Sequence, residues 1–327
     1  MKAIKVPLKE AEKVKSLLIK QGLLCRVCPP IKDSKYIYFA INGRVPGFTQ
    51  VEKRFNKIVS SDSLFLKGLT KKEYSLLPTS YDLIGDIMIL DLPEELSKKS
   101  KFIAETYIKI LKGIKVVADK VGIHHGVFRT QDLKILSGEK RKITTHIENG
   151  LRMKLNVETC YFSPRLSTDR IDVASQIKKP EQVLVMFSGV APYPLVISKY
   201  SKAKEIIGIE INPEAHKFAE ENIKLNKLKN IKVYQGDVRK VLPKLKMNFD
   251  RILMPLPRSA ELFLDLALEY IKPNGIIHLY GFSDDLQLAE SYVRAIKNLD
   301  NNAKILKIRK CGQFAPRKFR IRVDFSP

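Results

Sequence analysis

The chain lacks the features that mark several classes of protein. None of its 327 residues is tryptophan, only four are cysteine, and no run of 18 residues is wholly apolar. Four cysteines are too few for a disulfide framework in a chain of this length, and a membrane-spanning helix needs a longer apolar run. The first residues also lack the apolar core of a signal peptide. We therefore expect a cytoplasmic protein with no membrane partner.

The cysteine spacing offers one candidate metal site. Cys25 and Cys28 are spaced as zinc ligands often are, but no second close pair of cysteine or histidine residues completes a four-ligand site. Buried thiols or one local disulfide explain this pair better than zinc does. We expect no bound metal.

Acidic residues are few compared with basic ones. The chain has 59 lysine and arginine residues against 35 aspartate and glutamate residues, a net charge of +24. The excess is spread along the chain, and residues 304–322 hold eight basic side chains and no acidic one. A lysine-rich proteome explains part of this excess. A distributed positive field nevertheless favours a large polyanion bound across several domains, so RNA suits the composition.

Residues 183–257 alternate between strands and helices in the way that is typical of a parallel sheet. Strand-like apolar runs cover residues 183–187, 206–209, 231–234 and 249–253, with helix-period segments such as residues 213–225 between them. A β-α-β-α-β order implies parallel strands. Ligands of such sheets bind outside the carboxyl ends of the strands, where the loops after these runs fall.

Three residues that suit an adenosyl ligand follow successive strands. Glu210 lies 21 residues after Gly189, the separation at which an acid reaches ribose hydroxyls in nucleotide-binding units. A dinucleotide fingerprint needs three glycines, but Val190 and Ala191 follow Gly189, so S-adenosylmethionine fits better. Asp237 is placed to accept from the adenine amino group. Either acid alone could instead cap the following helix, but the three positions together favour the cofactor.

Several motifs extend this pattern over nearly the whole chain. They are Met-Phe-Ser-Gly-Val-Ala-Pro-Tyr-Pro from residue 186, Glu-Ile-Asn-Pro-Glu-Ala from residue 210, Gly-Asp-Val-Arg from residue 236 and Met-Pro-Leu-Pro from residue 254. Upstream are Gly-Val-Phe-Arg from residue 126 and Tyr-Phe-Ser-Pro-Arg-Leu from residue 161, and Phe-Ala-Pro-Arg follows from residue 314. As a set, these motifs resemble the archaeal tRNA (guanine-37-N1)-methyltransferase family.

The resemblance implies an α/β architecture in three parts. A class I S-adenosylmethionine-dependent methyltransferase domain with a Rossmann-like fold is expected over residues 159–327. Two smaller α/β domains precede it: an N-terminal tRNA-binding module over residues 1–65 and an α+β middle domain over residues 70–158 that contributes to the RNA site. In the family, the N-terminal module touches the outer corner of tRNA. We expect a monomer that binds the anticodon arm and this corner.

Local patterns predict several elements within these parts. Alternating runs around Asn149-Gly150 predict a β-hairpin. A short helix is expected over residues 51–58, and one strand over residues 83–90. The last two strands are expected to form a closing hairpin, with Arg320 and Arg322 on one face.

The resemblance also implies the residues of the site. The catalytic residues are expected to be Asp169, Arg129 and Tyr161. The cofactor-binding residues are expected to be Phe187, Gly189, Val190, Glu210, Ile211, Asp237, Val238 and Pro255. The RNA-binding residues are expected to be Arg165, Arg141, Arg317 and Lys318.

Methylation of guanine N1 is a problem of proton removal as well as of position. N1 carries a hydrogen, so a base must remove it while donors or cations stabilise the charge that moves to O6. Asp169 occupies the family's general-base position, where many relatives carry glutamate, and Arg129 the position that steadies O6 and the neighbouring phosphate. Tyr161 falls where the family lines the flipped base. The residues alone would instead favour an ion pair between Asp169 and a nearby arginine, Arg165 or Arg170.

Two departures from the family pattern bear on the activity. Val185 replaces the acid that usually ends the first strand, and Pro255 replaces the asparagine of an Asn-Leu-Pro motif. Pro255 has no N–H to donate. The Pro-Leu-Pro form resembles an archaeal branch that also methylates carbon 7 of the wyosine precursor, so this second activity is an expectation too.

Three other functions fit part of the sequence. An aminocarboxypropyl transferase of wyosine synthesis would use the same cofactor, and a non-catalytic tRNA-binding protein would keep the basic surface. A small-molecule methyltransferase would explain the three strand-end residues but not the net charge of +24.

Overall fold

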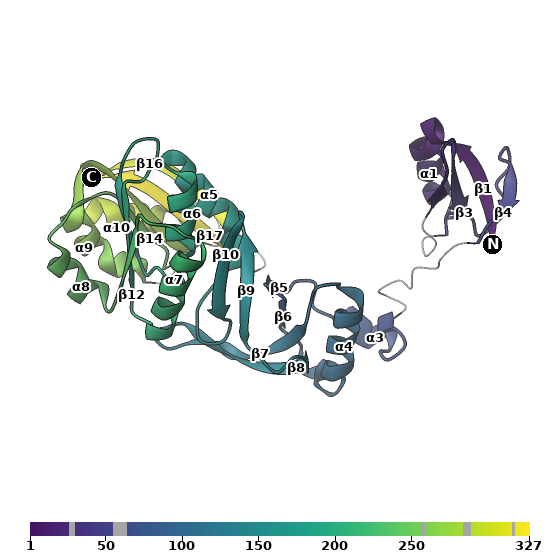
Figure 1. Cartoon of the computed structure of the whole chain (residues 1–327), viewed down its shortest axis with the longest axis horizontal. Helices are drawn as coiled ribbons and strands as arrows, with labels where there is room; N and C mark the ends of the chain where they lie inside the picture. Colours follow the sequence, from purple (N-terminus) through teal and green to yellow (C-terminus); the bar gives the residue numbers. More distant parts are fainter. Residues whose placement is uncertain (26–29, 55–63, 257–258, 284–288, 316–317) are drawn as a thin grey trace. The chain divides into compact units, whose positions relative to one another are not determined.

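The computed structural model describes residues 1–25, 30–54, 64–256, 259–283, 289–315 and 318–327. They form two compact units, Met1–Leu77 and Pro78–Pro327 (Figure 1). The boundary predicted near residue 158 lies inside the second unit. The predicted middle domain and the predicted methyltransferase domain therefore belong to one compact unit.

The first unit is built on an antiparallel sheet with strand order β2-β3-β1-β4. Its elements are β1 (Lys2–Pro7), η1 (Leu8–Glu10), α1 (Ala11–Lys20), β2 (Ile31–Lys32), β3 (Tyr36–Ala40), β4 (Gln50–Glu52) and α3 (Lys71–Ser75). Helix α1 buries Val14 and Leu18 against Ile4 and Phe39 of the sheet. This apolar face gives the unit a core of its own.

The helix predicted over residues 51–58 is wrong at its start. Val51 and Glu52 belong to strand β4, where Val51 pairs with Ala3 of β1. Pairing with β1 across the sheet outweighs the short helical period, as tertiary contacts often do. Residues 55–58 lie outside the described part of the chain.

The second unit begins with a four-stranded sheet of order β5-β6-β7-β8. Its elements are β5 (Asp82–Ile84), β6 (Ile87–Leu90), η2 (Glu94–Lys99), α4 (Ser100–Ile110), β7 (Val116–His125) and β8 (Thr130–Gly138). The single strand predicted over residues 83–90 is wrong, because the chain turns at Gly85 and forms the antiparallel pair β5 and β6. Gly85 has φ +58°, and a Cβ there would lie 2.2 Å from Thr144 Oγ1, so the turn requires glycine.

The predicted hairpin around Asn149-Gly150 is confirmed. Strands β9 (Ile143–Glu148) and β10 (Leu151–Asn156) pair in antiparallel register, and both turn residues have positive φ, 51° and 64°. Such a turn matches the right-handed twist of the two strands. Leu151 of β10 packs with Val183 of the large sheet, and Leu155 of β10 packs with Ile87 of β6. The hairpin therefore joins the two halves of the second unit.

The rest of the second unit is a seven-stranded sheet with order β13-β12-β11-β14-β15-β17-β16. Its strands are β11 (Gln182–Met186), β12 (Glu205–Glu210), β13 (Ile231–Gln235), β14 (Phe249–Met254), β15 (Ile271–Ser283), β16 (Lys304–Ala315) and β17 (Lys318–Ser326). Strands β11 to β15 pair in parallel, which confirms the predicted parallel sheet. Strands β16 and β17 form the predicted antiparallel closing hairpin.

Helices cover both faces of the large sheet (Figure 1). One face carries α5 (Ser167–Gln176), which follows η3 (Pro164–Leu166), together with α6 (Pro192–Tyr200) and α7 (Pro213–Leu225). The other face carries α8 (Val238–Leu245), α9 (Leu264–Tyr270), which follows η4 (Ala260–Phe263), and α10 (Ala289–Leu299). The strand order reverses between β11 and β14, so a binding crevice is expected there at the carboxyl ends.

Candidate active site

A cavity of about 670 Å³ lies at the carboxyl ends of the parallel strands. Of the eight predicted cofactor-binding residues, seven line it: Phe187, Gly189, Glu210, Ile211, Asp237, Val238 and Pro255. The eighth, Val190, is fully buried behind the wall, where its carbonyl accepts from Asn222 Nδ2 at 3.1 Å. The structure thus brings together the strand-end residues that the sequence places far apart.

The loop from β11 to α6 has an unusual backbone. Phe187, Gly189 and Ala191 have φ values of +60°, +56° and +69°, a conformation that costs non-glycine residues free energy. Ser188 N–H donates to Ile209 O at 2.9 Å, which ties this loop to the end of β12. The loop makes one tight turn and has no three-glycine phosphate cradle. Such a turn fits a cofactor without a pyrophosphate.

Glu210 is the buried carboxylate of this cavity. Its Oε2 accepts from Gly189 N–H at 2.7 Å, and its Oε1 accepts from Asn212 N–H at 2.8 Å. Burial raises the pKa of Glu210 above its ordinary value, while the bonds from the backbone N–H groups lower it in part. Each oxygen keeps a second lone pair, so this carboxylate is suited to accept from ligand hydroxyls.

Asp237 combines two roles. Its Oδ1 accepts from Arg239 N–H at 2.9 Å, so it caps helix α8 as either strand-end acid could have done. Asp237 also lines the cavity, and capping occupies one oxygen only. The two interpretations of this acid are therefore compatible.

Sequence reasoning missed several residues of the cavity wall. Phe263 of η4 lies edge to face with Phe187, with ring centroids 4.9 Å apart, and the Arg239 guanidinium lies 4.5 Å from the Phe263 ring centroid. Asp91 and Gln131 come from the other half of the unit. Asp91 directly follows strand β6, the same strand-end position that pointed to Glu210, so that signal could have found it.

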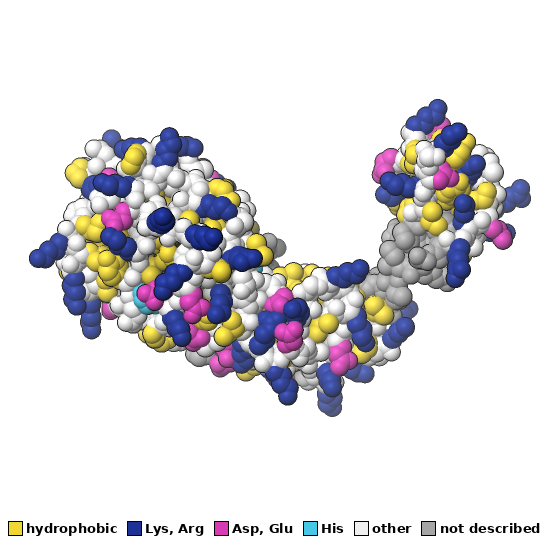
Figure 2. Space-filling model, viewed as in Figure 1, with side chains coloured by type: hydrophobic (Ala, Val, Ile, Leu, Met, Phe, Trp, Pro, Cys, Tyr) yellow, Lys and Arg dark blue, Asp and Glu magenta, His cyan; other side chains and the backbone are white. Residues whose placement is uncertain are grey.

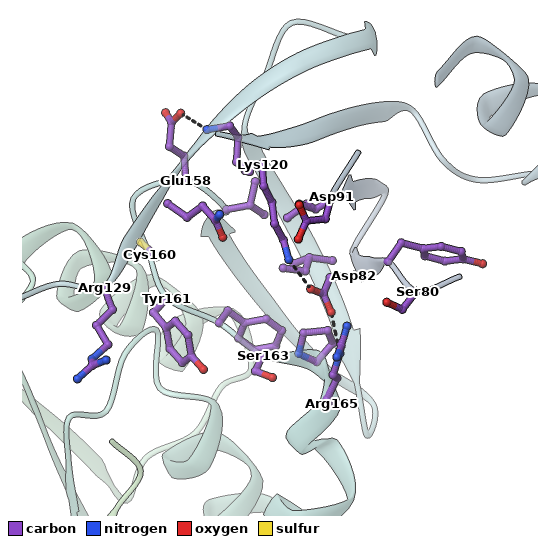
Figure 3. A pocket seen from close by; sticks show the side chains of 18 of the residues that line it. Ser80, Asp82, Asp91, Lys120, Arg129, Glu158, Cys160, Tyr161, Ser163 and Arg165 are labelled. Atoms are coloured by element: carbon purple, nitrogen blue, oxygen red, sulfur yellow. Dashed lines mark hydrogen bonds and ion pairs between the residues drawn. The ribbon is translucent and has the colours of Figure 1, made fainter. Parts of the chain in front are cut away.

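Figure 3 shows a second cavity, of about 340 Å³. The two share five wall residues: Asp91, Lys120, Arg129, Gln131 and Tyr161. Two of the three predicted catalytic residues, Arg129 and Tyr161, therefore lie where the cavities meet. Arg129 has φ +53° at the end of the β7–β8 turn, a strained conformation of the kind found at functional sites.

Asp169, the third predicted catalytic residue, lines neither cavity. Its side chain is buried, with Oδ1 accepting from Arg322 Nη1 and from Cys311 Sγ. Its Oδ2 accepts from the hydroxyls of Tyr193 and Tyr280 at 2.7 and 2.6 Å. The arginine paired with Asp169 is thus not Arg165 or Arg170, as sequence proximity suggested.

One side chain links this carboxylate to the second cavity. Cys311 lines the second cavity, and its Sγ lies 3.1 Å from Asp169 Oδ1. Burial raises the pKa of the Cys311 thiol far above its ordinary value, so the thiol is protonated and donates to Asp169. Asp169 therefore lies one side chain behind the cavity wall.

Three of the four predicted RNA-binding residues lie in the described part of the chain. Arg165 lines the second cavity and pairs with Asp82 at 2.9 Å (Figure 3). Arg141 pairs with Asp86, which raises the pKa of Arg141 further. Lys318 is exposed on β17, and Arg317 lies outside the described residues. Lysine and arginine side chains are spread over the visible faces of both units (Figure 2).

The described residues contain no cluster of three metal-ligating side chains. Cys25 is a buried free thiol, and Cys28 lies outside the described residues. Among the helices that the structure describes, none is long and apolar enough to cross a membrane.

The fold and the two cavities define an α/β protein of the methyltransferase class, and comparison with known proteins gives the family. Residues 144–308 match the TRM5/TYW2 methyltransferase domain, residues 62–141 the TYW2 N-terminal domain, and residues 3–49 the tRNA methyltransferase 5 N-terminal domain. The chain belongs to the TRM5/TYW2 methyltransferase family.

Relatives of this chain include methyltransferases that act on guanine-37 and proteins named for wyosine synthesis. The tRNA (guanine(37)-N(1))-methyltransferase Trm5b of Pyrococcus abyssi is 35% identical, with 99% of this chain and 98% of that protein aligned. The tRNA (guanine(37)-N(1))/4-demethylwyosine(37)-methyltransferase Taw22 of Nanoarchaeum equitans is 32% identical over 75% of this chain and 98% of its own. A tRNA(Phe) (4-demethylwyosine(37)-C(7)) aminocarboxypropyltransferase of Pyrococcus horikoshii is 33% identical over 84% and 96%.

Solved structures agree with this placement. The crystal structure of Trm5b from Pyrococcus abyssi matches 100% of this chain and 99% of its own with a TM-score of 0.79 and 35% identity. The complex of aTrm5 with tRNALeu matches 99% of both chains with a TM-score of 0.75 and 30% identity. TYW2 of Pyrococcus horikoshii bound to MeSAdo matches 81% of this chain and 97% of its own, with a TM-score of 0.68 and 30% identity.

Proposed function

We propose that this protein transfers a methyl group from S-adenosylmethionine to N1 of guanine-37 in tRNA. The observation that carries the proposal is the pair of adjoining cavities, one lined by the strand-end acids and the other sharing Arg129 and Tyr161 with it. The Pyrococcus abyssi enzyme is 35% identical over 99% of this chain, and this similarity supports the same reaction and substrate.

The larger cavity is proposed to hold the cofactor. Glu210 accepts from the ribose hydroxyls, Asp237 accepts from the adenine amino group, and Phe187 and Phe263 supply apolar walls. The bound cofactor supplies an electrophilic methyl group. Because Val185 replaces the usual acid, backbone groups of the loop around Gly189 hold the amino-acid end. A relative bound to MeSAdo at 30% identity supports this use of the cavity.

The smaller cavity is proposed to hold the flipped guanine. Arg129, on the wall common to both cavities, donates to O6 as negative charge develops there. Tyr161, on the same common wall, lines the base. Together they hold the base beside the cofactor cavity, and such positioning accounts for a large share of many enzymatic rate enhancements.

Asp169 is proposed to accept the N1 proton, as the family position implies. Its carboxylate lies behind Cys311, so the proposal requires this side chain to turn aside when the base enters. The Arg322 guanidinium donates to Asp169 Oδ1 and holds this carboxylate in position behind the cavity wall.

Two related reactions are the alternatives that the family offers. Methylation of carbon 7 of the wyosine precursor is the second candidate, because Pro255 lines the cofactor cavity where Asn is common and a dual-activity relative is 32% identical. Aminocarboxypropyl transfer is the third candidate, since the aminocarboxypropyltransferase of Pyrococcus horikoshii is 33% identical over 84% of this chain. The first of these would place carbon 7 of the tricyclic base, instead of guanine N1, where the two cavities meet. The second would place a different carbon of the cofactor there.

The remaining expectations about partners follow from the same proposal. We propose that the anticodon arm contacts Arg165, Arg141, Arg317 and Lys318, and that the first unit contacts the outer corner of the tRNA. A solved complex of a relative with tRNALeu supports a tRNA partner. A cytoplasmic monomer remains the expectation for the protein in the cell.

The deciding experiment is mass spectrometry of nucleosides from unmodified tRNA after incubation with enzyme and S-adenosylmethionine. We expect 1-methylguanosine from guanine-37 and none from tRNA with adenine at that position. A mass increase that matches an aminocarboxypropyl group, seen on tRNA carrying the tricyclic precursor, would instead assign the third reaction. Cofactor binding without any methylated or aminocarboxypropylated product would indicate a non-catalytic tRNA-binding protein.

A further inference from the structure

Arg320, on strand β17, is a buried arginine that has no acidic partner among the residues the structure describes. Its side chain is 6% exposed and lies in the wall of the smaller cavity. Nη2 of Arg320 donates to the Tyr161 hydroxyl at 2.7 Å, and Nη1 donates to Ser163 Oγ at 3.3 Å. Its Nε has no hydrogen-bond partner in the described part of the chain. The hydrogen bonds that Arg320 makes there are to neutral oxygen atoms.

The other buried arginines of the described residues differ in this respect. Arg170 pairs with Glu148, Arg251 with Glu181, and Arg322 with Asp169, Asp172 and Asp324. Within the described residues, no carboxylate oxygen lies within 4.0 Å of the Arg320 guanidinium. Burying a charge without a counter-charge costs several kcal/mol in general. Charged side chains are almost never fully buried without a partner, so this arginine is a candidate for a functional role.

The surroundings of Arg320 connect both cavities. Its guanidinium carbon lies 5.5 Å from the ring centroid of Phe282, which lines the larger cavity, and its partner Tyr161 lines both. Strand pairing fixes this position, because Arg320 lies opposite Phe282 on β15 and Gly312 on β16. The guanidinium is thus held from several sides at the wall where the base is proposed to enter.

We propose that Arg320 contacts the substrate directly, and that an anionic oxygen of the RNA completes its missing ion pair. This inference rests on the proposed function. Two sources supply such an oxygen: the O6 of guanine, which gains charge as the N1 proton leaves, or the phosphate next to the flipped nucleotide. An arginine fork is suited to either, since it donates several hydrogen bonds at fixed geometry and stays charged.

The test compares Arg320→Met with the wild-type protein in single-turnover methyl transfer and in tRNA binding at several salt concentrations. If the oxygen is O6, the rate at saturating tRNA falls by about 10²-fold while tRNA affinity is unchanged, because the contact strengthens only as charge develops. If the oxygen belongs to a phosphate, tRNA affinity falls and the slope of log affinity against log salt decreases by about 1. Either result supports the proposal.

Two further variants separate substrate contact from structural support. Lys304→Met removes one charge from the same β-hairpin, outside both cavity walls, and is expected to keep the wild-type rate and salt slope. Tyr161→Phe, alone and combined with Arg320→Met, shows whether Arg320 acts only by holding Tyr161. Arg320→Met should keep or raise the melting temperature, because an apolar group replaces a buried charge that lacks a counter-charge.

Three results would overturn the proposal. The first is a wild-type rate and a wild-type salt slope in Arg320→Met. The second is a lowered melting temperature with a matching loss of cofactor affinity, which would mark a structural residue. The third is disappearance of the Arg320→Met effect in the Tyr161→Phe background. In each case the wild-type control still reports 1-methylguanosine formation, so failure of the proposed function itself would be recognised separately.

Discussion

Nη1 of Arg322 donates to Oδ1 of Asp169 in the core of the second unit, where both side chains are buried. The same guanidinium donates to Asp172 Oδ2 at 2.7 Å and to Asp324 Oδ1 at 2.7 Å. Arg322 therefore contacts three carboxylates, and one of them, Asp169, is buried away from solvent. This arrangement makes Asp169 both a structural partner and a candidate base.

The first prediction separates these two roles. Asp169→Asn keeps the shape of the side chain but removes its basicity, so single-turnover methyl transfer to guanine-37 should fall by roughly 10²–10⁴. Asp172→Asn is the matched control, because it also removes a carboxylate from Arg322 on the same helix. Quench measurements at saturating tRNA, with melting temperatures for both variants, provide the comparison. Equal small losses in the two variants would leave Asp169 a structural residue only.

The second prediction concerns the pH dependence of cofactor binding. Burial raises the pKa of Glu210, so its protonated fraction is larger than usual in mildly acidic solution. Ribose hydroxyls donate more strongly to the ionised carboxylate, so cofactor affinity should rise as pH increases through this raised pKa. Titration calorimetry between pH 4.5 and 7 would measure the change (roughly the range just above an ordinary carboxyl pKa). Glu210→Gln should bind more weakly and lose this pH dependence.

The third prediction tests whether Asp237 binds the cofactor in addition to capping helix α8. Asp237→Ala should weaken cofactor binding by about 1.5–3 kcal/mol if its carboxylate accepts from the adenine amino group. Asp237→Asn should retain most of the helix cap, since asparagine caps as well as aspartate does. Binding and thermal unfolding of the two variants then separate the cap from the cofactor contact. Wild-type affinity in Asp237→Ala would leave Asp237 only the capping role.

The fourth prediction concerns the first unit. Removal of Met1–Leu77 takes away a compact unit with its own core, so cofactor binding by the rest should change little. Binding of full-length tRNA should weaken, and the slope of log affinity against log salt should fall by about 0.9 for each phosphate that this unit neutralises. Filter binding of tRNA at several salt concentrations gives both quantities. An unchanged slope would show that this unit neutralises no phosphates.

A stability prediction follows from the backbone at Gly138. Its φ is +94°, and an added Cβ would lie 2.0 Å from the backbone oxygen of Lys115. Gly113 has a similar φ of +101° but open space around the added atom. Gly113→Ala should therefore cost about 1–2 kcal/mol from backbone strain alone, and Gly138→Ala should cost more because backbone must move. Chemical unfolding of the two variants makes the comparison, and equal costs would contradict the predicted clash.

The sequence by itself determined the parallel sheet and the positions of its ligand-binding loops. Apolar runs and the residues that end them are local features, so Glu210 and Asp237 could be placed at the cavity before any fold was known. The Asn149-Gly150 turn was equally local, because two positive φ angles are needed within two residues. Strand-end position would have found Asp91 in the same way.

Only the tertiary structure decided which side chains meet. Asp169 and Arg322 are 153 residues apart in the chain, and no local period relates them. The hairpin of β16 and β17 brings Arg322 under Asp169 and Arg320 to the cavity wall, two residues apart on one strand face. Whether a buried arginine has a carboxylate partner depends on packing of distant strands. The sequence placed Arg320 and Arg322 on the same face of one strand. It could not predict that Arg322 pairs with carboxylates while Arg320 lies in a cavity wall.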